Sequence, residues 1–341
     1  MSESSSPTDL PLISILIAAR NEEHTILDCL RAIDQLDYPK NKLQILIGND
    51  NSTDRTLEVV NTFILDKPAY RSITISELVP NLNGKANVLA HLAHYATGTF
   101  LFTTDADARV SPTWLRAMIR QFETEKMAKK IGVVSGCTTI RGNTIWAKVQ
   151  AVECVLVFRL IALAADFGIP LTGVGNNMAI RREAYEAVGG FERLPFSVVE
   201  DYTLFQAIVG KGYGFGNKLD PDTLVQMLPP PSIGAYLQQR KRWMRGVFDL
   251  PLPLLLTTLI QYLLGPLLLV LAFWFPALAL GLYAAKVLGQ TLLLWSALIQ
   301  LRQTHLWVSM LLYEPYQTLF GLLAFVYYWL PTGVVWKGRR Y

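Results

Sequence analysis

Short apolar runs rich in β-branched and aromatic residues alternate with amphipathic helical patterns from Ile13 to Ser135, and this alternation most constrains the fold. The predicted strands cover residues 13–18, 43–47, 72–76, 99–104 and 132–135, and the helices between them cover residues 25–35, 55–65, 85–95 and 112–122. Such alternation is solved most economically by an α/β fold with a doubly wound, mostly parallel sheet. Ligands of these sheets bind beyond the carboxyl ends of the strands, so we expect the site there.

Asp105 and Asp107 leave the end of the fourth predicted strand with only Ala106 between them. Alternation along an extended chain directs both carboxylates to the same side, where they repel each other unless a cation lies between them. Oxygen ligands suit a hard divalent ion, Mg²⁺ or Mn²⁺, which commonly bridges protein carboxylates and a diphosphate. The alternative is an ordinary acidic turn. Asp50 follows the second predicted strand, so one nucleotide-sized ligand could contact all three aspartates.

Three further segments carry polar groups suited to a site. Lys85 opens a predicted helix and could contact a base or a phosphate, although a solvated lysine fits the sequence equally well. The loop at residues 172–177, which contains Asn176, could let a sugar or an acceptor approach the backbone, or could be an ordinary turn. Glu200 and Asp201 open a helix, where a carboxylate serves either as a helix cap or as a general base for an acceptor hydroxyl.

A basic amphipathic helix is predicted to begin near Ser232. Gln239, Arg242 and Trp243 lie at i, i+3 and i+4 and therefore share one face of it. An amide, a guanidinium and an indole together suit recognition of a diphosphate and a stacked sugar or base. The rival interpretation is a helix that lies on anionic lipid through its other basic residues, Arg240, Lys241 and Arg245.

Apolar residues make up 51% of the chain and charged residues 17%, which is apolar for a soluble protein. No charge occurs from Leu250 to Ala285, and further apolar segments cover residues 287–301 and 306–336. We therefore predict a membrane domain at residues 250–336 with two to four helices, one of which could lie in the interface. A polar, disordered N-terminus at residues 1–9 precedes a cytosolic domain at residues 10–249, and a basic cytosolic tail follows at residues 337–341.

The number of membrane spans stays open at this point. The first apolar segment is long enough for one tilted helix or, broken at Gly265-Pro266, for an interfacial helix and a spanning one. A cytosolic domain and a cytosolic tail require an even number of spans, whereas the simplest count of apolar segments is three. The acidic N-terminus lacks a signal-peptide pattern, so we expect an integral protein of the cell membrane whose first domain faces the cytosol.

Several classes of protein are excluded by what the sequence lacks. A net charge of +4 without a basic-aromatic groove pattern argues against a nucleic-acid partner. The first predicted strand is not followed by Gly-x-Gly-x-x-Gly, and the chain has no Walker-type Gly-Lys-Ser/Thr, which argues against a dinucleotide enzyme or a P-loop kinase. Cys29, Cys137 and Cys154 fit no zinc or disulfide framework, so we interpret them as small hydrophobic residues in a reducing cytosol.

Four separated motifs resemble those of the membrane-bound family-2 glycosyltransferases of GT-A fold that carry Gln-x-x-Arg-Trp. They are residues 49–54, Asp105–Asp107, Glu200-Asp201 and Gln239–Trp243, and the resemblance covers about Leu12 to Trp243. This group includes ceramide glucosyltransferases and cellulose, chitin and hyaluronan synthases. The first motif departs from the family pattern, because Asn49 stands where the family often has aspartate.

The resemblance implies a role for individual residues. Asp50 would contact the nucleotide base or ribose, and Lys85 would assist at the nucleotide. Asp105 and Asp107 would serve the nucleotide and the diphosphate-bound metal, with Asp107 the closer metal ligand. Asp201 would be the catalytic base. The helix residues would hold the donor diphosphate and the acceptor end: Gln239, Arg242 and Trp243.

The implied reaction is inverting, metal-dependent transfer of a hexose from a nucleotide-sugar, in the first instance a UDP-sugar. Because no membrane helix precedes the catalytic domain and few follow it, we expect transfer of a single sugar to the hydroxyl of a membrane lipid, with Asn176 and Glu200 near the acceptor. One alternative is a processive polysaccharide synthase. Another is a catalytically inactive membrane scaffold, against which the retention of every charged motif argues.

Overall fold

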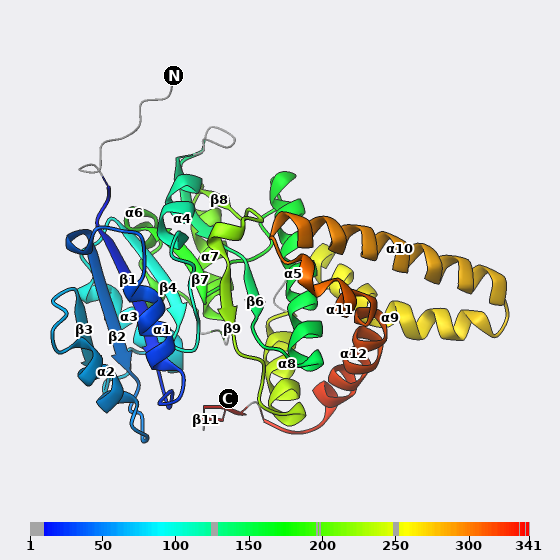
Figure 1. Cartoon of the computed structure of the whole chain (residues 1–341), viewed down its shortest axis with the longest axis horizontal. Coiled ribbons are helices and arrows are strands. Elements are labelled where there is room, and N and C mark those ends of the chain that lie inside the picture. The colour runs from blue at the N-terminus through cyan, green and yellow to red at the C-terminus, as the bar shows by residue number, and fades with distance from the viewer. Residues whose placement is uncertain are drawn as a thin grey trace. The chain divides into compact units, whose positions relative to one another are not determined.

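The computed structural model of the chain describes residues 10–123, 129–195, 197, 199–247, 252–333, 335–337 and 339–340 (Figure 1). Packing divides the chain into two compact units. The first comprises residues 1–138 and 164–227, and the second comprises residues 139–163 and 228–341. The predicted disordered N-terminus, residues 1–9, lies outside the described residues. The predicted division into domains at residues 10–249 and 250–336 stays a prediction. The helices at residues 145–166 and 233–247 belong largely to the second unit, with the apolar helices.

Among the described residues, a seven-stranded sheet forms the centre of the first unit, in the order β3-β2-β1-β4-β7-β5-β8. Its strands are β1 (Ile13–Ala19), β2 (Leu43–Asn49), β3 (Tyr70–Thr74), β4 (Phe100–Asp105), β5 (Ile131–Ser135), β7 (Asn177–Arg181) and β8 (Gly214–Gly216). The strands β3, β2, β1 and β4 are parallel to one another, and their register aligns Ala18 with Asp105 and Ala19 with Asn49. The carboxyl ends of β2, β1 and β4 therefore meet at one edge, as the sequence predicted.

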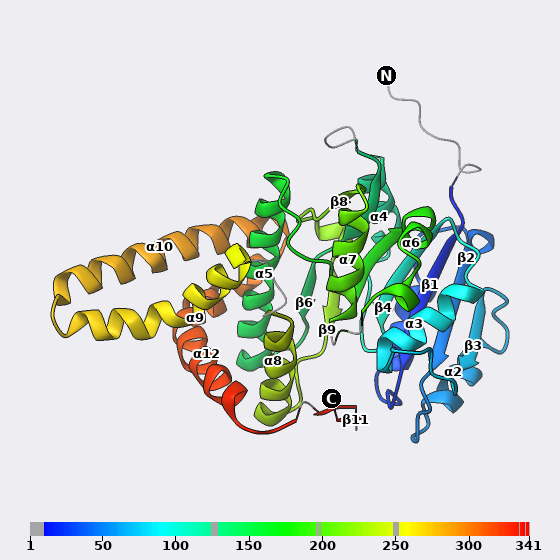
Figure 2. The ribbon, with the colours of Figure 1, turned by 180° about the vertical axis from the view of Figure 1, so that it is seen from behind.

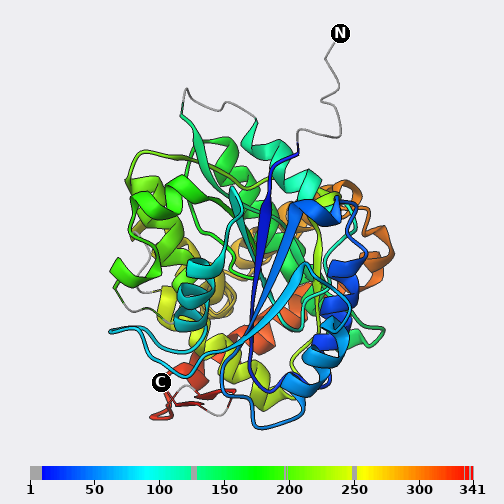
Figure 3. The same ribbon diagram turned by 90° about the vertical axis from the view of Figure 1, so that its left-hand side faces the viewer.

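Helices cover both faces of this sheet, which Figure 3 shows with the strands between two helical layers. The helices are α1 (Ile26–Asp34), α2 (Thr56–Ile64), α3 (Gly84–Tyr95), α4 (Trp114–Phe122), α6 (Arg182–Ala187) and α7 (Glu200–Gly210). Ile15 and Ile17 of β1 belong to the core that α1, α2 and α4 cover, whereas Leu16 belongs to the core under α3, α6 and α7. This period of two buries both faces of the strand, and it confirms a doubly wound, mostly parallel sheet.

One strand departs from the predicted alternation. β7 lies between β4 and β5 and runs antiparallel to both, with Asn177 opposite Thr104. Because the two strands run in opposite directions, β7 begins where β4 ends. The loop at residues 172–176 is thereby brought to the carboxyl end of β4, beside Asp105. The short apolar run at residues 178–180 carries no signal in the sequence that would distinguish this arrangement from a parallel one.

Shorter elements connect the larger ones. They are β6 (Thr138–Ile140), β9 (Val225–Met227) and single 3-10 turns at Lys40–Lys42, Phe191–Arg193, Pro221–Thr223 and Thr304–Leu306.

The second unit is helical. Its helices are α5 (Ile145–Asp166, whose last residues belong to the first unit), α8 (Ile233–Val247), α9 (Leu252–Ala272), α10 (Pro276–Gln300), α11 (Trp307–Leu311) and α12 (Tyr313–Trp329), followed by the strand pair β10 (Val335–Trp336) and β11 (Arg339–Arg340). Helices α9 and α10 pack side by side as an antiparallel hairpin, drawn in yellow and orange in Figures 1 and 2. The first apolar segment, residues 250–285, therefore contains α9 and the first turns of α10, and α10 continues through the second apolar segment.

The chain does not break at Gly265-Pro266, which was one of the two alternatives that the sequence left open. Pro266 lies inside α9, and the chain turns at Phe273–Phe275. Pro276 is the first residue of α10, a position where proline is favoured because its missing N–H is not needed there. Phe275 before it has a φ of −135°, consistent with the steric restriction that proline places on its predecessor.

Within the described part of the chain, one helix, α10, is long and apolar enough to cross a membrane, and Leu263–Ala272 of α9 is a shorter apolar helix. The turn that joins them is exposed, with 90% of Phe273 and 70% of Trp274 accessible. The single charge of α10, Lys286, forms an ion pair with the buried Glu314 of α12. Gln290 donates a hydrogen bond to the same carboxylate over 3.0 Å. The charge of α10 is thus neutralised within the unit.

Candidate active site

The carboxyl edge of the sheet carries the predicted acidic residues. Asp50 follows β2, is 6% exposed, and accepts a hydrogen bond at its backbone carbonyl from the Arg20 guanidinium over 2.6 Å. Asp105 ends β4, and Asp107 follows after the buried Ala106. Both carboxylates are half-buried, so they lie at the surface of the edge rather than in the core. The three aspartates predicted to share a ligand therefore lie at the same edge of the sheet, at the ends of the two strands that flank β1.

Lys85 joins the two acidic motifs of this unit. Its Nζ lies 2.6 Å from Oδ1 of Asp105 and 3.5 Å from Oε1 of Glu200, and its side chain is 15% exposed. Gly84, with a φ of 54°, lets the chain turn into α3 directly before it, in a conformation that side chains rarely adopt. The alternative of a solvated lysine is wrong. Lys85 is a half-buried cation that bridges residues 105 and 200.

The electrostatics of this cluster keep Lys85 charged. Burial by itself would lower the pKa of the ammonium group, because it penalises the charged form. The negative charges of Asp105, Glu200 and Asp201 outweigh burial and raise the pKa of Lys85 above its ordinary value. The cluster therefore retains a positive charge among its three carboxylates throughout the physiological pH range.

The Asp201 carboxylate is hydrogen-bonded to the loop that precedes β7. Its Oδ2 accepts a hydrogen bond from the backbone N–H of Gly175 over 2.6 Å, and its Oδ1 accepts one from the N–H of Tyr202 over 2.8 Å. A side chain at position 175 would meet Asp201, because a Cβ there would lie 3.0 Å from its Cβ and Oδ2. One oxygen of the carboxylate therefore accepts from an N–H in the first turn of its own helix, and the other contacts the loop. A carboxylate has further lone pairs, so it can also accept a hydrogen bond from a substrate hydroxyl.

Asn176 is fixed on both sides. Its backbone carbonyl accepts a hydrogen bond from the Thr104 hydroxyl over 3.0 Å, and its side-chain Oδ1 accepts one from the Thr138 hydroxyl over 2.9 Å. The loop at residues 172–176 is therefore tied to the end of β4 rather than being a simple turn. The predicted roles of Asn176 and Glu200 at the acceptor stay predictions.

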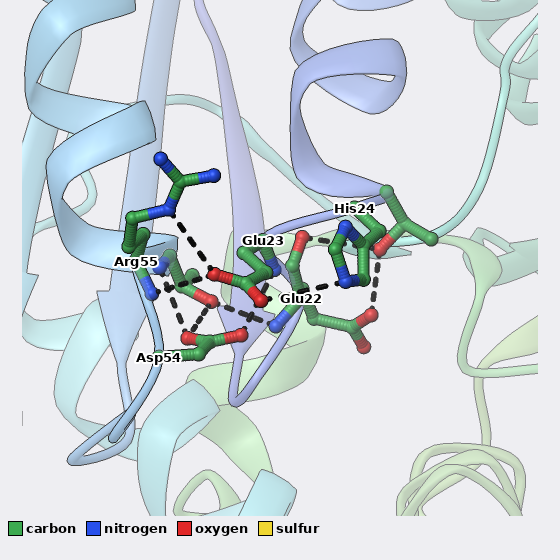
Figure 4. A network of polar contacts seen from close by, with 7 residues as sticks. Glu22, Glu23, His24, Asp54 and Arg55 are labelled. Atoms are coloured by element: carbon green, nitrogen blue, oxygen red, sulfur yellow. Dashed lines mark hydrogen bonds and ion pairs between the residues drawn. The ribbon is translucent and has the colours of Figure 1, made fainter.

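The loops after β1 and β2 are bonded to each other at the same edge, as Figure 4 shows. The N–H groups of Glu22 and Glu23 donate to Thr56 Oγ1 and Asp54 Oδ2 over 2.7 and 3.0 Å, and the Glu23 carboxylate accepts from the N–H of Arg55 over 3.0 Å. Burial would raise the pKa of Asp54, but hydrogen bonds from Thr56 and from the N–H of Glu23 outweigh it and lower the pKa. The two loops are thus joined by hydrogen bonds, and together they fix the backbone at Asp50.

The Gln-x-x-Arg-Trp residues lie on α8, in the second unit. Gln239 and Arg242 are half-buried, and 42% of Trp243 is exposed. The rival interpretation of a lipid-facing basic helix is wrong for two of its three residues, because Arg240 and Lys241 are buried against protein. It stays a prediction that one ligand contacts both the acidic cluster of the first unit and these three residues: Gln239, Arg242 and Trp243.

The chemistry of the Asp105–Asp107 pair fits a hard divalent cation. Lys85 binds one oxygen of Asp105, and the carboxylate has a second to offer. Within the described part of the chain, three or more histidine, cysteine or acidic side chains are nowhere grouped for a metal. A protein with two carboxylates can hold Mg²⁺ or Mn²⁺ when phosphate oxygens and water complete the shell. Burial, together with the charges of Asp107 and Asp105, raises the pKa of the nearby Cys29 thiol, so a thiolate ligand is not expected.

Comparison with known proteins bears on this site. Residues 2–341 match the family described as Glycosyl transferase family 21. The chain belongs to this family. The glycosyltransferase class inferred from the four motifs is thereby confirmed, and the narrower group that carries Gln-x-x-Arg-Trp stays a prediction.

Curated relatives of this family-21 chain include glycosyltransferases with different products. It is 29% identical over 243 residues to a probable glycosyltransferase, YdaM, of Bacillus subtilis, a match that covers 70% of this chain and 56% of that protein. It is 28% identical over 236 residues to a poly-β-1,6-N-acetyl-D-glucosamine synthase of Staphylococcus epidermidis, covering 69% and 54%. It is 28% identical over 182 residues to a β-monoglucosyldiacylglycerol synthase of Nostoc sp., covering 53% and 38%. The chain thus spans about half the length of these relatives, or less.

Among solved structures, the family-21 chain is similar to the mannosyltransferase PcManGT of Pyrobaculum calidifontis, determined in complex with GDP-Man and Mn²⁺. The TM-score is 0.58 at 20% sequence identity, and the match covers 92% of this chain and 88% of that one. The similarity shows a shared glycosyltransferase fold.

Two features of the site escaped sequence reasoning. Gly175 was one small residue in a polar loop, and nothing local indicates that its N–H meets Asp201. The strand-end residues 20–23 were visible as a polar segment, but their bonds to residues 52–56 depend on how β1 and β2 pair. Asn21 and Asn51, with φ of 52° and 49°, are the one local signal, because asparagine tolerates the left-handed region better than most residues.

Proposed function

We propose that this chain transfers a hexose, with inversion, from a nucleotide-sugar to the hydroxyl of a membrane lipid. The observation that carries the proposal is the cluster in which Lys85 joins Asp105 to Glu200, with Asp201 beside them. The cluster brings the proposed donor-binding aspartate, Asp105, close to the proposed base, Asp201, in a chain that belongs to a glycosyltransferase family.

The donor would bind along the carboxyl edge of the sheet. Asp50 would contact the base or ribose, supported by the joined loops after β1 and β2. Lys85, a permanent cation, would attract the diphosphate while it keeps Asp105 in place. Gln239, Arg242 and Trp243 would hold the diphosphate and the acceptor end, because a guanidinium forms strong charge-assisted hydrogen bonds with phosphate. The nucleotide we propose is UDP.

Asp105 and Asp107 would hold Mg²⁺ or Mn²⁺, with Asp107 the closer ligand. When bound, the ion would neutralise charge on the diphosphate leaving group. The support is the donor set itself, two half-buried carboxylates separated by one buried residue.

Asp201 would act as the general base. The acceptor hydroxyl would give its proton to the carboxylate as its oxygen attacks the anomeric carbon, and the bond to the diphosphate would break on the opposite side. Arg242 would stabilise the charge that builds on the departing diphosphate. The hydrogen bond from Gly175 would hold the carboxylate in a fixed direction during this step. A single displacement of this kind inverts the anomeric configuration.

The acceptor we propose is a lipid. The exposed apolar surface of α9, α10 and their aromatic turn supports membrane attachment, and one relative is named for its glucosyldiacylglycerol product. A processive polysaccharide synthase is the second candidate, because another relative is named for a polymer.

We propose that the protein is integral to the cell membrane with its catalytic unit in the cytosol. In this proposal α10 would cross the bilayer, and α9, whose apolar stretch Leu263–Ala272 is shorter, would form the other half of the hairpin. Two crossings leave the segments before and after the hairpin on the same side, which removes the conflict with a basic cytosolic tail.

The test is an assay on membranes that contain the full chain. They are incubated with labelled UDP-sugars and GDP-sugars, with Mn²⁺ or with EDTA, and the organic phase is analysed by mass spectrometry. One added hexose on a lipid, lost with EDTA, supports the proposal. A ladder of products in the aqueous phase supports the polysaccharide synthase. Absence of both transfer and donor hydrolysis with every donor contradicts an enzyme and favours a scaffold.

A further inference from the structure

Adjacent residues of helix α8 differ sharply in burial. Arg240 and Lys241 have exposed fractions of 8% and 3%, although arginine and lysine are rarely buried unless paired. Gln239 and Arg242, adjacent to them in sequence, are half-buried, and Trp243 is exposed. The two cations therefore face the interior of the second unit.

Arg240 is bound by two other helices of the unit. Its Nη2 lies 2.5 Å from Oε2 of Glu153 on α5, and the two side chains are 10% and 15% exposed. Tyr316 of α12 donates its hydroxyl to the same Oε2 over 3.0 Å. The Arg240 guanidinium also lies over the rings of Tyr236 and Trp243, 4.7 and 4.5 Å from their centroids. Arg240 thus connects α5 and α12 to one of the motif residues.

Lys241 and Gln238 form a second attachment on the same helix. Lys241 Nζ donates to the carbonyl of Leu330 over 2.6 Å and to the Thr332 hydroxyl over 2.9 Å. Leu330 is the C-cap of α12, where a cation interacts favourably with the helix dipole. Gln238 donates to the Tyr327 hydroxyl over 2.7 Å. Polar contacts therefore hold the helix on both sides of Gln239.

These contacts specify the rotation of α8 about its axis. Each residue along a helix turns the side-chain direction by roughly 100°, so a rotation that released Arg240 would also redirect Gln239 and Arg242. Apolar contacts tolerate a small rotation of the helix. A buried ion pair does not, because its charges are paired in only one arrangement, and fixing the register of packed helices is the best-documented role of such pairs. Stability alone does not require it, because a well-packed apolar pair serves as well.

We propose that Arg240 is a positioning residue for glycosyl transfer, held by Glu153 and Tyr316 so that α8 presents Gln239, Arg242 and Trp243 to the donor. The inference rests on the proposed function. Arg240 itself contacts neither donor nor acceptor; it acts by fixing the orientation of α8 about its axis.

The test compares three variants in membranes and in detergent: Arg240→Met, the double variant Glu153→Leu with Arg240→Met, and Glu153→Gln. Transfer is measured with the same labelled UDP- and GDP-sugars, and stability is measured as the thermal unfolding midpoint. Arg302→Met, which removes an exposed arginine of the same unit, is the matched control and should keep the wild-type rate.

Arg240→Met leaves the Glu153 carboxylate buried without its cation, so both rate and stability should fall. The double variant should recover the unfolding midpoint, because an apolar pair replaces the ion pair, while kcat stays at least about tenfold below wild type. Glu153→Gln leaves the Arg240 guanidinium buried without its counter-ion, so both its unfolding midpoint and its kcat should fall. A double variant with the wild-type rate, or an unchanged kcat in Glu153→Gln, overturns the inference. Wild-type membranes that transfer no sugar contradict the proposed function instead.

Discussion

Replacement of Gly175 by alanine is expected to displace the carboxylate of Asp201. The new Cβ would lie 3.0 Å from Cβ and Oδ2 of Asp201 and 3.2 Å from Nζ of Lys85, distances shorter than ordinary van der Waals contact. Lys85 cannot simply swing away, because its ammonium group is held 2.6 Å from Asp105. Asp201 must therefore shift by a few tenths of an ångström, and the hydrogen bond from the Gly175 N–H must lengthen.

The size of the effect follows from that hydrogen bond. A hydrogen bond to a charged group contributes about 1.5–3 kcal/mol, and its loss corresponds to a factor of roughly 10–100. Misplacement of a catalytic group by about 1 Å costs up to about 100-fold in rate. We therefore expect kcat for hexose transfer to fall about 10- to 100-fold. The KM for the donor should change by less than about threefold, because the donor contacts assigned to Asp50 and Arg242 are not altered.

The assay measures kcat and donor KM on purified membranes, with the nucleotide-sugar that gives the lipid product. Gly210→Ala is the matched control, because Gly210 lies on the same helix as Asp201 and a Cβ there meets nothing within 4 Å. A helix with alanine in place of glycine is more stable by about 0.5–1 kcal/mol, so this control should keep the wild-type kcat and have a slightly higher unfolding midpoint. A Gly175→Ala variant with the wild-type kcat would refute the assignment of Asp201 as a base held by this loop.

Four further outcomes follow from the same structure. Asp201→Asn should retain donor binding, measured by displacement of labelled donor, and should lose transfer by about 10²–10⁴-fold; near-normal turnover would remove the base assignment. Arg242→Ala should raise the donor KM and lower kcat together, since a charge-assisted contact is lost, and an effect on neither would exclude a role at the diphosphate. Lys85→Met should lower the free energy of unfolding by roughly 3 kcal/mol, seen in denaturant titration, because three carboxylates lose their shared cation, whereas Lys85→Arg should retain part of it. Burial raises the pKa of Cys137 to about 12, so iodoacetamide at pH 8 should label it only after denaturation, as peptide mass spectrometry would show; labelling of the folded protein would contradict its burial.

Much of the first unit could be predicted from local pattern. The predicted strands at residues 13–18, 43–47 and 99–104 match β1, β2 and β4 to within two residues, because strands buried on both faces of a parallel sheet appear in the sequence as short continuous apolar runs. The acidic residues at the strand ends follow from the same pattern. Their meeting at one edge follows from the parallel pairing that strand–helix alternation requires.

The partners of individual side chains could not be predicted in this way. The bridge from Lys85 to Glu200 joins residues that are 115 positions apart, and it depends on the antiparallel insertion of β7, which brings its loop and α7 to the end of β4. Likewise, the pattern at residues 239–243 placed three residues on one face but could not show which face is buried. Arg240 and Lys241 look like lipid-binding residues until Glu153 and the end of α12 are placed beside them.

The sequence by itself determined the alternation of strands and helices, the acidic ends of the strands and the face shared by Gln239, Arg242 and Trp243. These depend on neighbours within one turn or one strand, where backbone geometry dictates direction. The tertiary structure alone decided that Gly175 binds Asp201, that Lys85 bridges two carboxylates and that Arg240 is buried. The physical reason is that each of these contacts joins distant segments, and the packing of the whole unit must compensate the entropy lost on bringing them together.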